Sequence, residues 1–451
     1  MKKIRSTIAP LIGILFLCGG WQFFALIAHQ SELVPTLPKL LQTLGELACT
    51  KAFYQSIGMT IARGLEGMLL SITFAITTAC ICARFKIINE ALRPLLAFTR
   101  SIPVISFILL ALIFMEANHI PVLIAFLTMF PLLTENLTRG ISAFRPELST
   151  MAHQFQIAHH NLLFQIYYPQ LKPFLFSGLA SAAGFGWRTI IMGEVLAQCT
   201  HGIGGEMKRA QNFIDIPTLL AWTIVATIVS FLFDKGINWL ANLNSNIIFT
   251  KEKQDISPTP IDTLNAKNIS YQYGVQNFSY CFQKENIYGI SAPSGKGKTT
   301  LLHLLGGIFN PLSGAIQPQI KFGVATIFQA PELLTHLSAE ENIMLPLASF
   351  MNAEKAQEIA HLYLKKMGME ALGKRLPETL SYGQQQRIAI ARALAYPSPL
   401  LLMDEPFKGL DENVRSHIIE CIKKERTGRI IIFTSHNPEE MKSLADKVIY
   451  L

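Results

Sequence analysis

Charged residues are scarce in this chain. Asp, Glu, Lys and Arg together make up 16% of its 451 residues, whereas 50% of the residues are hydrophobic. Soluble globular domains carry roughly 25% charged residues. The composition therefore excludes an ordinary soluble protein and predicts several membrane-spanning helices.

Cysteine is also rare, and the basic residues are not gathered in one place. The seven cysteines are odd in number and follow no metal-ligand spacing, so they indicate neither a disulfide framework nor a zinc site. The formal net charge of +8 is spread over short loops between apolar runs rather than along one face or tail. We therefore expect no nucleic-acid partner and attribute the excess of Lys and Arg to the positive-inside rule.

The apolar segments predict about six transmembrane helices. The first covers residues 8–28 and lacks a small-x-small cleavage site, so we interpret it as a retained helix and not as a signal peptide. The other five are expected at residues 59–83, 95–114, 120–137, 174–196 and 216–240. Six spans place both termini on one side of a lipid bilayer, and the basic loops indicate the cytoplasmic side of a bacterial inner membrane.

Charged residues lie inside the predicted membrane segments, among them Arg63, Arg100, Arg188 and Glu194. A charge inside a bilayer costs roughly 2.5–3.5 kcal/mol by insertion scales, so such groups normally find a partner or line a water-filled path. Arg188 and Glu194 do not share a helical face, so we do not expect them to pair with each other. Two interpretations stay open, a place in the transport pathway or side chains that reach the interface from helix ends.

The character of the sequence changes at residues 250–261, a polar stretch with two prolines that indicates a linker. Short β-branched runs then alternate with helical stretches, as in an α/β domain. The predicted organisation is a helical membrane domain over residues 1–249, this linker, and an α/β domain over residues 262–451.

A glycine-rich turn between a predicted strand and a predicted helix forms a phosphate cradle. Backbone N–H groups would face the phosphates of ATP, Lys298 would reach the β- and γ-phosphates, and Thr299 would offer its hydroxyl to Mg²⁺. The predicted nucleotide-binding residues in this turn are Ser294, Gly295, Gly297, Lys298, Thr299 and Thr300. The turn predicts that residues 262–451 form an α/β P-loop NTPase domain.

A second, buried strand ends in two acids, Asp404 and Glu405. At the end of such a strand Asp404 would hold Mg²⁺, and Glu405 would polarise the water that attacks the γ-phosphate. Their order and spacing from Lys298 fit an ATP-hydrolysing site.

The stretch Leu380-Ser381-Tyr382-Gly383-Gln384, before a helix, resembles the signature of ATP-binding cassette (ABC) proteins. The rest of the pattern follows in order over the domain. Tyr273 resembles the aromatic residue that stacks on adenine, Gln329 the glutamine that contacts Mg²⁺ and senses the permease, and His436 the switch histidine on the γ-phosphate. Two positions depart from the pattern, Ala292 and Tyr382, where glycine is usual.

This resemblance implies a dimer. In the family Ser381, Gly383 and Gln384 act on ATP that is bound to Lys298 of another cassette, so one cassette cannot complete a site. A chain with one permease and one cassette is most simply a homodimer with two shared ATP sites.

The membrane domain resembles importer permeases. Residues 150–156 and 166–169 partly match their cytoplasmic coupling motif, and residues 37–39, 100–103, 187, 193–194 and 202–204 resemble the nitrate/sulfonate/taurine type. The resemblance implies a separate substrate-binding protein and a small solute as substrate. Relatives of this type also carry thiamine precursors. An ABC exporter and a membrane protein that ATP regulates without transport remain the other two hypotheses.

Overall fold

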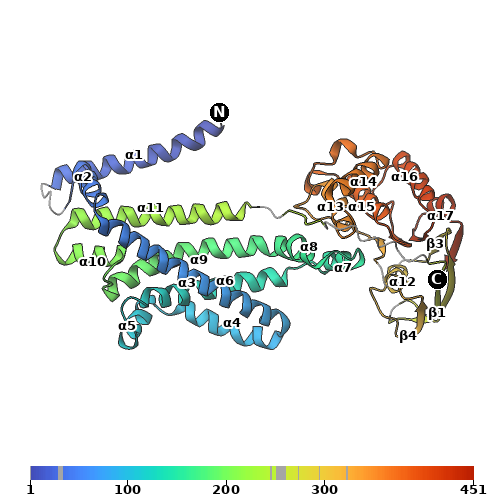
Figure 1. Ribbon diagram of the computed structural model, residues 1–451, viewed down its shortest axis with the longest axis horizontal. Coiled ribbons are helices and arrows are strands. Elements are labelled where there is room, and N and C mark those ends of the chain that lie inside the picture. Colours follow the sequence, from blue (N-terminus) through green and yellow to red (C-terminus); the bar gives the residue numbers. More distant parts are fainter. Residues whose placement is uncertain are drawn as a thin grey trace. The chain divides into compact units, whose positions relative to one another are not determined.

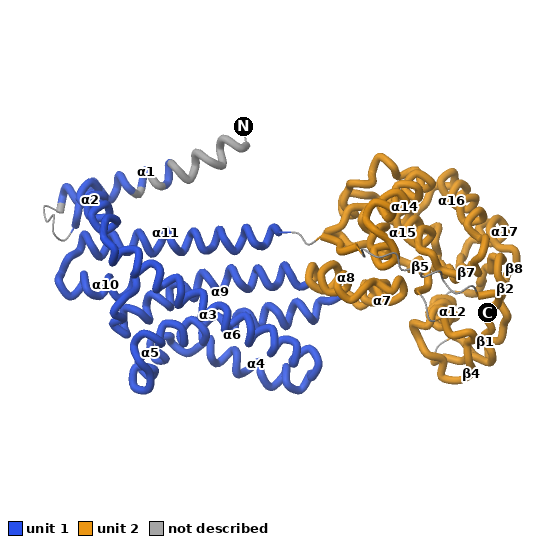
Figure 2. The backbone as a smooth tube through the Cα atoms, in the orientation of Figure 1, with its two compact units in different colours: residues 1–144, 171–243 blue, residues 145–170, 244–451 orange. Residues whose placement is uncertain are grey.

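The computed structural model describes residues 2–28, 34–243, 246–249, 261–272, 274–293, 295–320 and 323–451. The chain divides into two compact units. Unit 1 comprises residues 1–144 and 171–243, and unit 2 comprises residues 145–170 and 244–451 (Figure 2).

Unit 1 is helical (Figure 1). Its helices are α1 (Lys2–Ala28), α2 (Leu37–Ala48), α3 (Lys51–Arg84), α4 (Lys86–Ser101), α5 (Val104–Phe114), α6 (Ile120–Ser142), α9 (Tyr168–Ala197), α10 (Ile203–Asn212) and α11 (Ile216–Ala241). The most extensive contact between two of these helices joins α3 to α6. Small side chains such as Ala75 and Ala79 of α3 and Ala125 of α6 are completely buried there, and small residues allow membrane helices to approach closely.

Among the described residues, α3, α6 and α11 are each long and apolar enough to cross a membrane. Helices α4 and α5 pass the same test together but are bent by 90° at the break between them, which makes a fourth span if the bent pair counts as one. The predicted spans at residues 8–28 and 174–196 lie in α1 and α9. The helical membrane domain is confirmed, and the count of six spans stays a prediction.

The core of unit 2 is a parallel sheet with the strand order β5-β6-β7-β3-β8. Its strands are β3 (Ile287–Ser291), β5 (Ala325–Ile327), β6 (Leu400–Asp404), β7 (Ile430–Thr434) and β8 (Lys447–Tyr450). Every residue of β6 and β7 is buried. Continuous apolar runs of this kind are typical of parallel strands that are covered on both faces, and the predicted α/β domain is confirmed.

Helices and a second sheet complete unit 2. The antiparallel sheet has the order β2-β1-β4 and consists of β1 (Thr263–Ser270), β2 (Phe278–Gln283) and β4 (Ser313–Gln317). The main helices are α12 (Lys298–Leu305), α13 (Ala339–Leu347), α14 (Ala353–Lys366), α15 (Tyr382–Ala395), α16 (Glu412–Lys424) and α17 (Pro438–Leu444).

Residues 145–170 belong to unit 2 by their contacts, although in sequence they follow α6 and extend into the first turn of α9. They form α7 (Pro146–Gln154), the short α8 (His159–Asn161) and a π-helical turn over Leu162–Tyr167. Phe155 and Ile166 are fully buried in the hydrophobic core of unit 2. The predicted domain boundaries count this segment with the membrane domain, whereas burial of its apolar side chains groups it with unit 2. The predicted linker lies outside the described residues except for Ile261.

Candidate nucleotide site and a buried membrane cluster

Three neighbouring parallel strands carry the predicted catalytic residues at their carboxyl ends. The glycine-rich turn follows β3, the two acids end and follow β6, and His436 follows β7. Because β6, β7 and β3 are adjacent in the sheet, these loops meet at one edge, which is where ligands bind in open parallel sheets.

The glycine-rich turn depends on backbone angles that L side chains rarely adopt. Gly295 has φ +79° and Gly297, the N-cap of α12, has φ +84°, and glycine reaches this region without steric cost. Lys298 is 7% exposed, and its ammonium group donates to the carbonyl oxygens of Ala292 (2.7 Å) and Pro293 (3.3 Å). The predicted ligand Ser294 lies outside the described residues.

Asp404 joins the turn to the end of β6. Its carboxylate accepts from the Thr299 hydroxyl at 2.7 Å and from the Thr434 hydroxyl at 2.6 Å. Magnesium prefers oxygen ligands and is commonly held by one or two carboxylates together with phosphate oxygens. The hydroxyl and carboxylate that the sequence predicts as metal ligands therefore lie together and fit Mg²⁺.

Glu405 and His436 also lie together. The His436 Nε2 atom is 3.2 Å from the Glu405 Oε1 atom, and the Glu405 amide donates to the Thr434 hydroxyl at 3.1 Å. Glu405 has φ +47°, a left-handed conformation for a residue that has a side chain. Backbone strain of this kind concentrates at functional sites.

The signature residues build the start of α15. The Ser381 hydroxyl accepts from the Gln384 amide (3.3 Å), and the Gln384 side chain accepts from the Ser381 amide (3.0 Å). This reciprocal capping box fixes the helix N-terminus. Within the described part of the chain, no hydrogen bond or ion pair joins Ser381, Gly383 or Gln384 to Lys298.

Tyr382 makes a contact that sequence reasoning did not predict. Its hydroxyl donates to the backbone carbonyl of Gln329 at 3.0 Å. Burial, with smaller contributions from the carboxylates of Glu405 and Glu332, raises the pKa of Tyr382 above its ordinary value. The side chain of Gln329 is exposed. Tyr382, which stands where glycine is usual, thus links the signature to the loop that carries Gln329. Tyr273, the residue predicted to stack on adenine, lies outside the described residues.

Residues 145–170 dock through Gln154, which is 4% exposed. The Gln154 side-chain amide donates to the backbone carbonyl of Gly306 (3.0 Å) and accepts from the Thr326 hydroxyl (3.2 Å). The backbone carbonyl of Gln154 accepts from the Val324 amide (2.9 Å). Thr326 belongs to β5, the strand that leads to Gln329. Gln154 falls within residues 150–156, which partly match the coupling motif, but the sequence did not predict its individual contacts.

Two arginines hold the same segment. Arg392 lies under Phe155 at 5.3 Å from its ring and donates to the carbonyls of Pro331 and Glu332. Burial lowers the pKa of Arg392 to about 10, an effect that the Glu332 carboxylate opposes. Arg145 pairs with Glu332 at 2.5 Å. The contact between residues 145–170 and the rest of unit 2 therefore combines buried apolar side chains with two arginines, both of which bond to Glu332.

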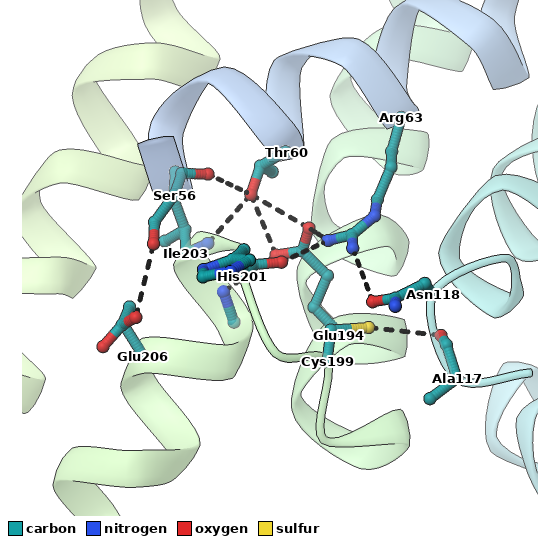
Figure 3. A network of polar contacts seen from close by, with 11 residues as sticks. Ser56, Thr60, Arg63, Ala117, Asn118, Glu194, Cys199, His201, Ile203 and Glu206 are labelled. Carbon is teal, nitrogen blue, oxygen red and sulfur yellow. Dashed lines mark hydrogen bonds and ion pairs between the residues drawn. The ribbon is translucent and has the colours of Figure 1, made fainter. Parts of the chain in front are cut away.

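Unit 1 contains a buried polar cluster around Glu194 (Figure 3). Glu194 is completely buried and pairs with Arg63 of α3 at 2.7 Å. The same carboxylate accepts from the Thr60 hydroxyl (2.9 Å) and from the Gly204 amide (2.9 Å). Arg63, and not Arg188, is thus the partner of Glu194. The full burial of Glu194 contradicts the interpretation that its side chain reaches the membrane interface.

Arg63 ties two further segments to this cluster. Its guanidinium donates to the His201 carbonyl at 2.7 Å and to the Asn118 side chain at 3.0 Å. The cluster therefore connects α3, the loop between α5 and α6, and the loop between α9 and α10. Gly202 has φ +142°, and an added Cβ would lie 2.6 Å from the Glu194 carboxylate, so a larger residue would displace the loop from the ion pair.

Comparison with known proteins agrees with a chain of two different domains. The family model for the ABC transporter matches residues 275–408, and the model for the binding-protein-dependent transport system inner membrane component matches residues 71–245. The fold and these matches define the chain as a membrane permease domain fused to an ATPase.

The curated relatives align with about two fifths of the chain. The thiamine import ATP-binding protein ThiQ of Shigella flexneri is 33% identical over 191 residues, which cover 40% of this chain and 82% of that protein. The Fe(3+) ions import ATP-binding protein FbpC 1 of Rhizobium meliloti is 33% identical over 201 residues, 41% of this chain and 57% of that protein. The chain belongs to the ABC transporter family.

A solved structure also resembles part of the chain. It is a dimeric ATP-binding cassette in a post-hydrolysis state with ADP and phosphate bound. The alignment has 28% sequence identity, a TM-score of 0.39, and covers 42% of this chain and 94% of the solved chain.

Proposed function

We propose that this chain is a half-transporter whose homodimer imports a small solute into a bacterial cytoplasm across the inner membrane, driven by ATP hydrolysis. The observation that carries the proposal is the position of residues 145–170. They connect two helices of the membrane domain in sequence, yet Gln154 bonds to the strand that leads to Gln329, and Phe155 is buried in the core of the cassette. A movement of that strand would pass along the chain to α6 and α9.

The residues at the carboxyl edge of the sheet would divide the chemistry of hydrolysis. Lys298 would exchange its carbonyl partners in the glycine-rich turn for the phosphates of ATP. Thr299 and Asp404, with Gln329, would hold Mg²⁺, which neutralises phosphate charge when bound. Glu405 would orient and polarise the attacking water, and His436 would hold Glu405 and contact the γ-phosphate.

Two cassettes would share each site. Ser381 and Tyr382 are exposed at the start of α15, where Ser381 and Gln384 fix the orientation of the helix N-terminus. A helix N-terminus with free N–H groups attracts phosphate. This supports a second copy that supplies the signature to the ATP of the first, with closure on ATP binding and reopening after hydrolysis.

A nitrate-, sulfonate- or taurine-like anion is the substrate class that the permease resemblance favours, with a thiamine precursor as the other importer substrate. The thiamine and iron relatives align over a length that matches the cassette, so their names bear on the ATPase rather than on the solute. A separate substrate-binding protein would deliver the solute.

The test is uptake by the purified chain in proteoliposomes with its cognate binding protein. Nitrate, taurine and a thiamine precursor serve as labelled solutes, and ATP is supplied on the cassette side. We expect ATP-dependent accumulation of one solute and its complete loss in Lys298→Ala. Uptake that persists in Lys298→Ala would refute the ATP-driven mechanism, and ATP-dependent extrusion would establish an exporter.

A further inference from the structure

A cavity of about 530 Å³ lies within unit 1, between α3, α4 and α6. Small-molecule sites typically measure roughly 300–1,000 Å³. Its lining residues are Cys82, Asn89, Leu92, Arg93, Leu96, Arg100, Glu135, Thr138, Arg139, Ser142 and Ala143. Three arginines of two different helices therefore share one cavity of ligand size.

The spacing of the lining residues explains how the arginines converge. On α4 the lining positions are 89, 92, 93, 96 and 100, and on α6 they are 135, 138, 139 and 142. Residues three and four apart lie on the same face of a helix. One continuous face of each helix is thus turned toward the cavity, and each of these faces carries arginine.

Positive charge in the cavity exceeds negative charge. Glu135 pairs with Arg100 at 2.5 Å and with Arg139 at 2.5 Å, and it is the only acidic residue of the lining. Within the described part of the chain, Arg93 has no ion pair. One carboxylate therefore faces three guanidinium groups, and an additional anion would compensate the excess.

The face of α4 that is turned away from the cavity is apolar and exposed. Contact with water therefore does not explain why the arginines of α4 lie on the cavity side. Ile87, Leu95 and Phe98 are 82%, 58% and 64% exposed, as expected of side chains that contact lipid in a membrane domain. The helix therefore directs these three apolar side chains outward and its arginines toward the cavity that it shares with α3 and α6.

We propose that this cavity binds an oxyanion, a group of the phosphate, sulfonate or carboxylate class, through Arg93, Arg100 and Arg139. Guanidinium groups recognise such anions with paired, charge-assisted hydrogen bonds. Arg100 and Arg139 keep 40% and 68% of their side chains exposed, so both are open to a ligand. The oxyanion belongs either to an anionic lipid headgroup or to the transported solute; the second source rests on the proposed function.

Binding to the purified full chain separates the two sources. Lipid retention is counted by native mass spectrometry after reconstitution with phosphatidylglycerol, and methanesulfonate and inorganic phosphate are titrated calorimetrically. All measurements use Lys298→Ala without ATP, so a failure of ATP-driven transport cannot alter the readout.

Arg93→Gln removes the unpaired cation, and Lys86→Gln is the matched control because Lys86 is exposed on the same helix but does not line the cavity. We expect Arg93→Gln to weaken the affinity about tenfold, the equivalent of one charge-assisted hydrogen bond, and Lys86→Gln to change it less than about twofold. Arg93→Lys, which keeps the charge without the planar fork, should fall between them. Thermal unfolding of each variant checks that it is folded.

Each outcome decides the proposal. An Arg93-dependent loss of lipid retention identifies the headgroup, and an Arg93-dependent loss of methanesulfonate or phosphate binding identifies the solute. Equal losses in Arg93→Gln and Lys86→Gln would show diffuse attraction to surface charge and overturn the proposal, as would absence of binding by all three probes in the unsubstituted cavity.

Discussion

The nucleotide site and the Glu194 cluster hold their charges in different ways. In the cassette, Lys298 is bound to backbone carbonyls of its own turn, and Asp404 to two hydroxyls. In the membrane domain, Glu194 and Arg63 are bound to each other and to neutral partners. The charged groups of the nucleotide site can exchange their neutral partners for a ligand, whereas the charges of the Glu194 cluster already neutralise each other.

This difference reflects the surroundings of each group. An unpaired charge in a low-dielectric interior costs several kcal/mol, so a buried membrane carboxylate needs a permanent partner. Lys298 and Asp404 are also buried, at 7% exposed each, but their partners are neutral carbonyl and hydroxyl groups that a charged ligand can replace. The comparison therefore predicts that ATP affects the two regions unequally.

The largest effect is expected at Glu405. Glu405→Gln removes the group that polarises water, so kcat for ATP hydrolysis should fall about 10²–10⁴-fold while ATP still binds. The measurement is steady-state ATPase activity in lipid together with ATP-dependent thermal stabilisation, which should persist in Glu405→Gln and disappear in Lys298→Ala. Glu194→Gln should keep the ATP-dependent shift. If it abolished the shift, the two regions would not be independent.

The next effect is expected in the membrane cluster. Arg63→Met leaves Glu194 buried without its cation and should destabilise unit 1 by about 3–5 kcal/mol. The double variant Arg63→Met with Glu194→Met should recover most of this loss because it leaves no unpaired charge. Unfolding of both variants in detergent gives the comparison. Equal destabilisation by the single and double variants would show that hydrogen bonds, and not the ion pair, hold the cluster.

A smaller effect is expected where residues 145–170 enter the cassette. Gln154→Ala leaves buried partners unsatisfied and should weaken this contact by about 1–3 kcal/mol. Uptake should decrease more than ATPase activity, since the substitution loosens the connection and leaves the catalytic residues intact. His153→Ala is the control because His153 is exposed on the same helix. Equal decreases of both activities would contradict a role for Gln154 in coupling.

The smallest effect is expected at Tyr382. Tyr382→Phe removes one hydrogen bond to Gln329, worth about 0.5–1.5 kcal/mol, and should change ATP turnover by about a few-fold. Burial raises the pKa of Tyr382 above its ordinary value of 10, so the hydroxyl stays protonated below that pH. The ratio of wild-type to variant turnover should therefore stay constant from about pH 7 to 9. A ratio that changes over this range would mean that another group titrates in the contact.

Much of the cassette was readable from the sequence because its motifs are local. The order strand, turn and helix places Lys298 and Thr299 at the same edge as Asp404, and the structure brings the latter two within 2.7 Å. The hydrogen bond of Tyr382 to Gln329 was not predictable, since it joins residues 53 positions apart and no pattern relates their side chains.

The sequence by itself determined the two domain types, because apolar length and strand–turn–helix order are properties of short segments. Only the tertiary structure paired Glu194 with Arg63, 131 positions away, and only it grouped residues 145–170 with the cassette. Both outcomes depend on which distant surfaces bury each other, and burial is decided by the packed chain as a whole.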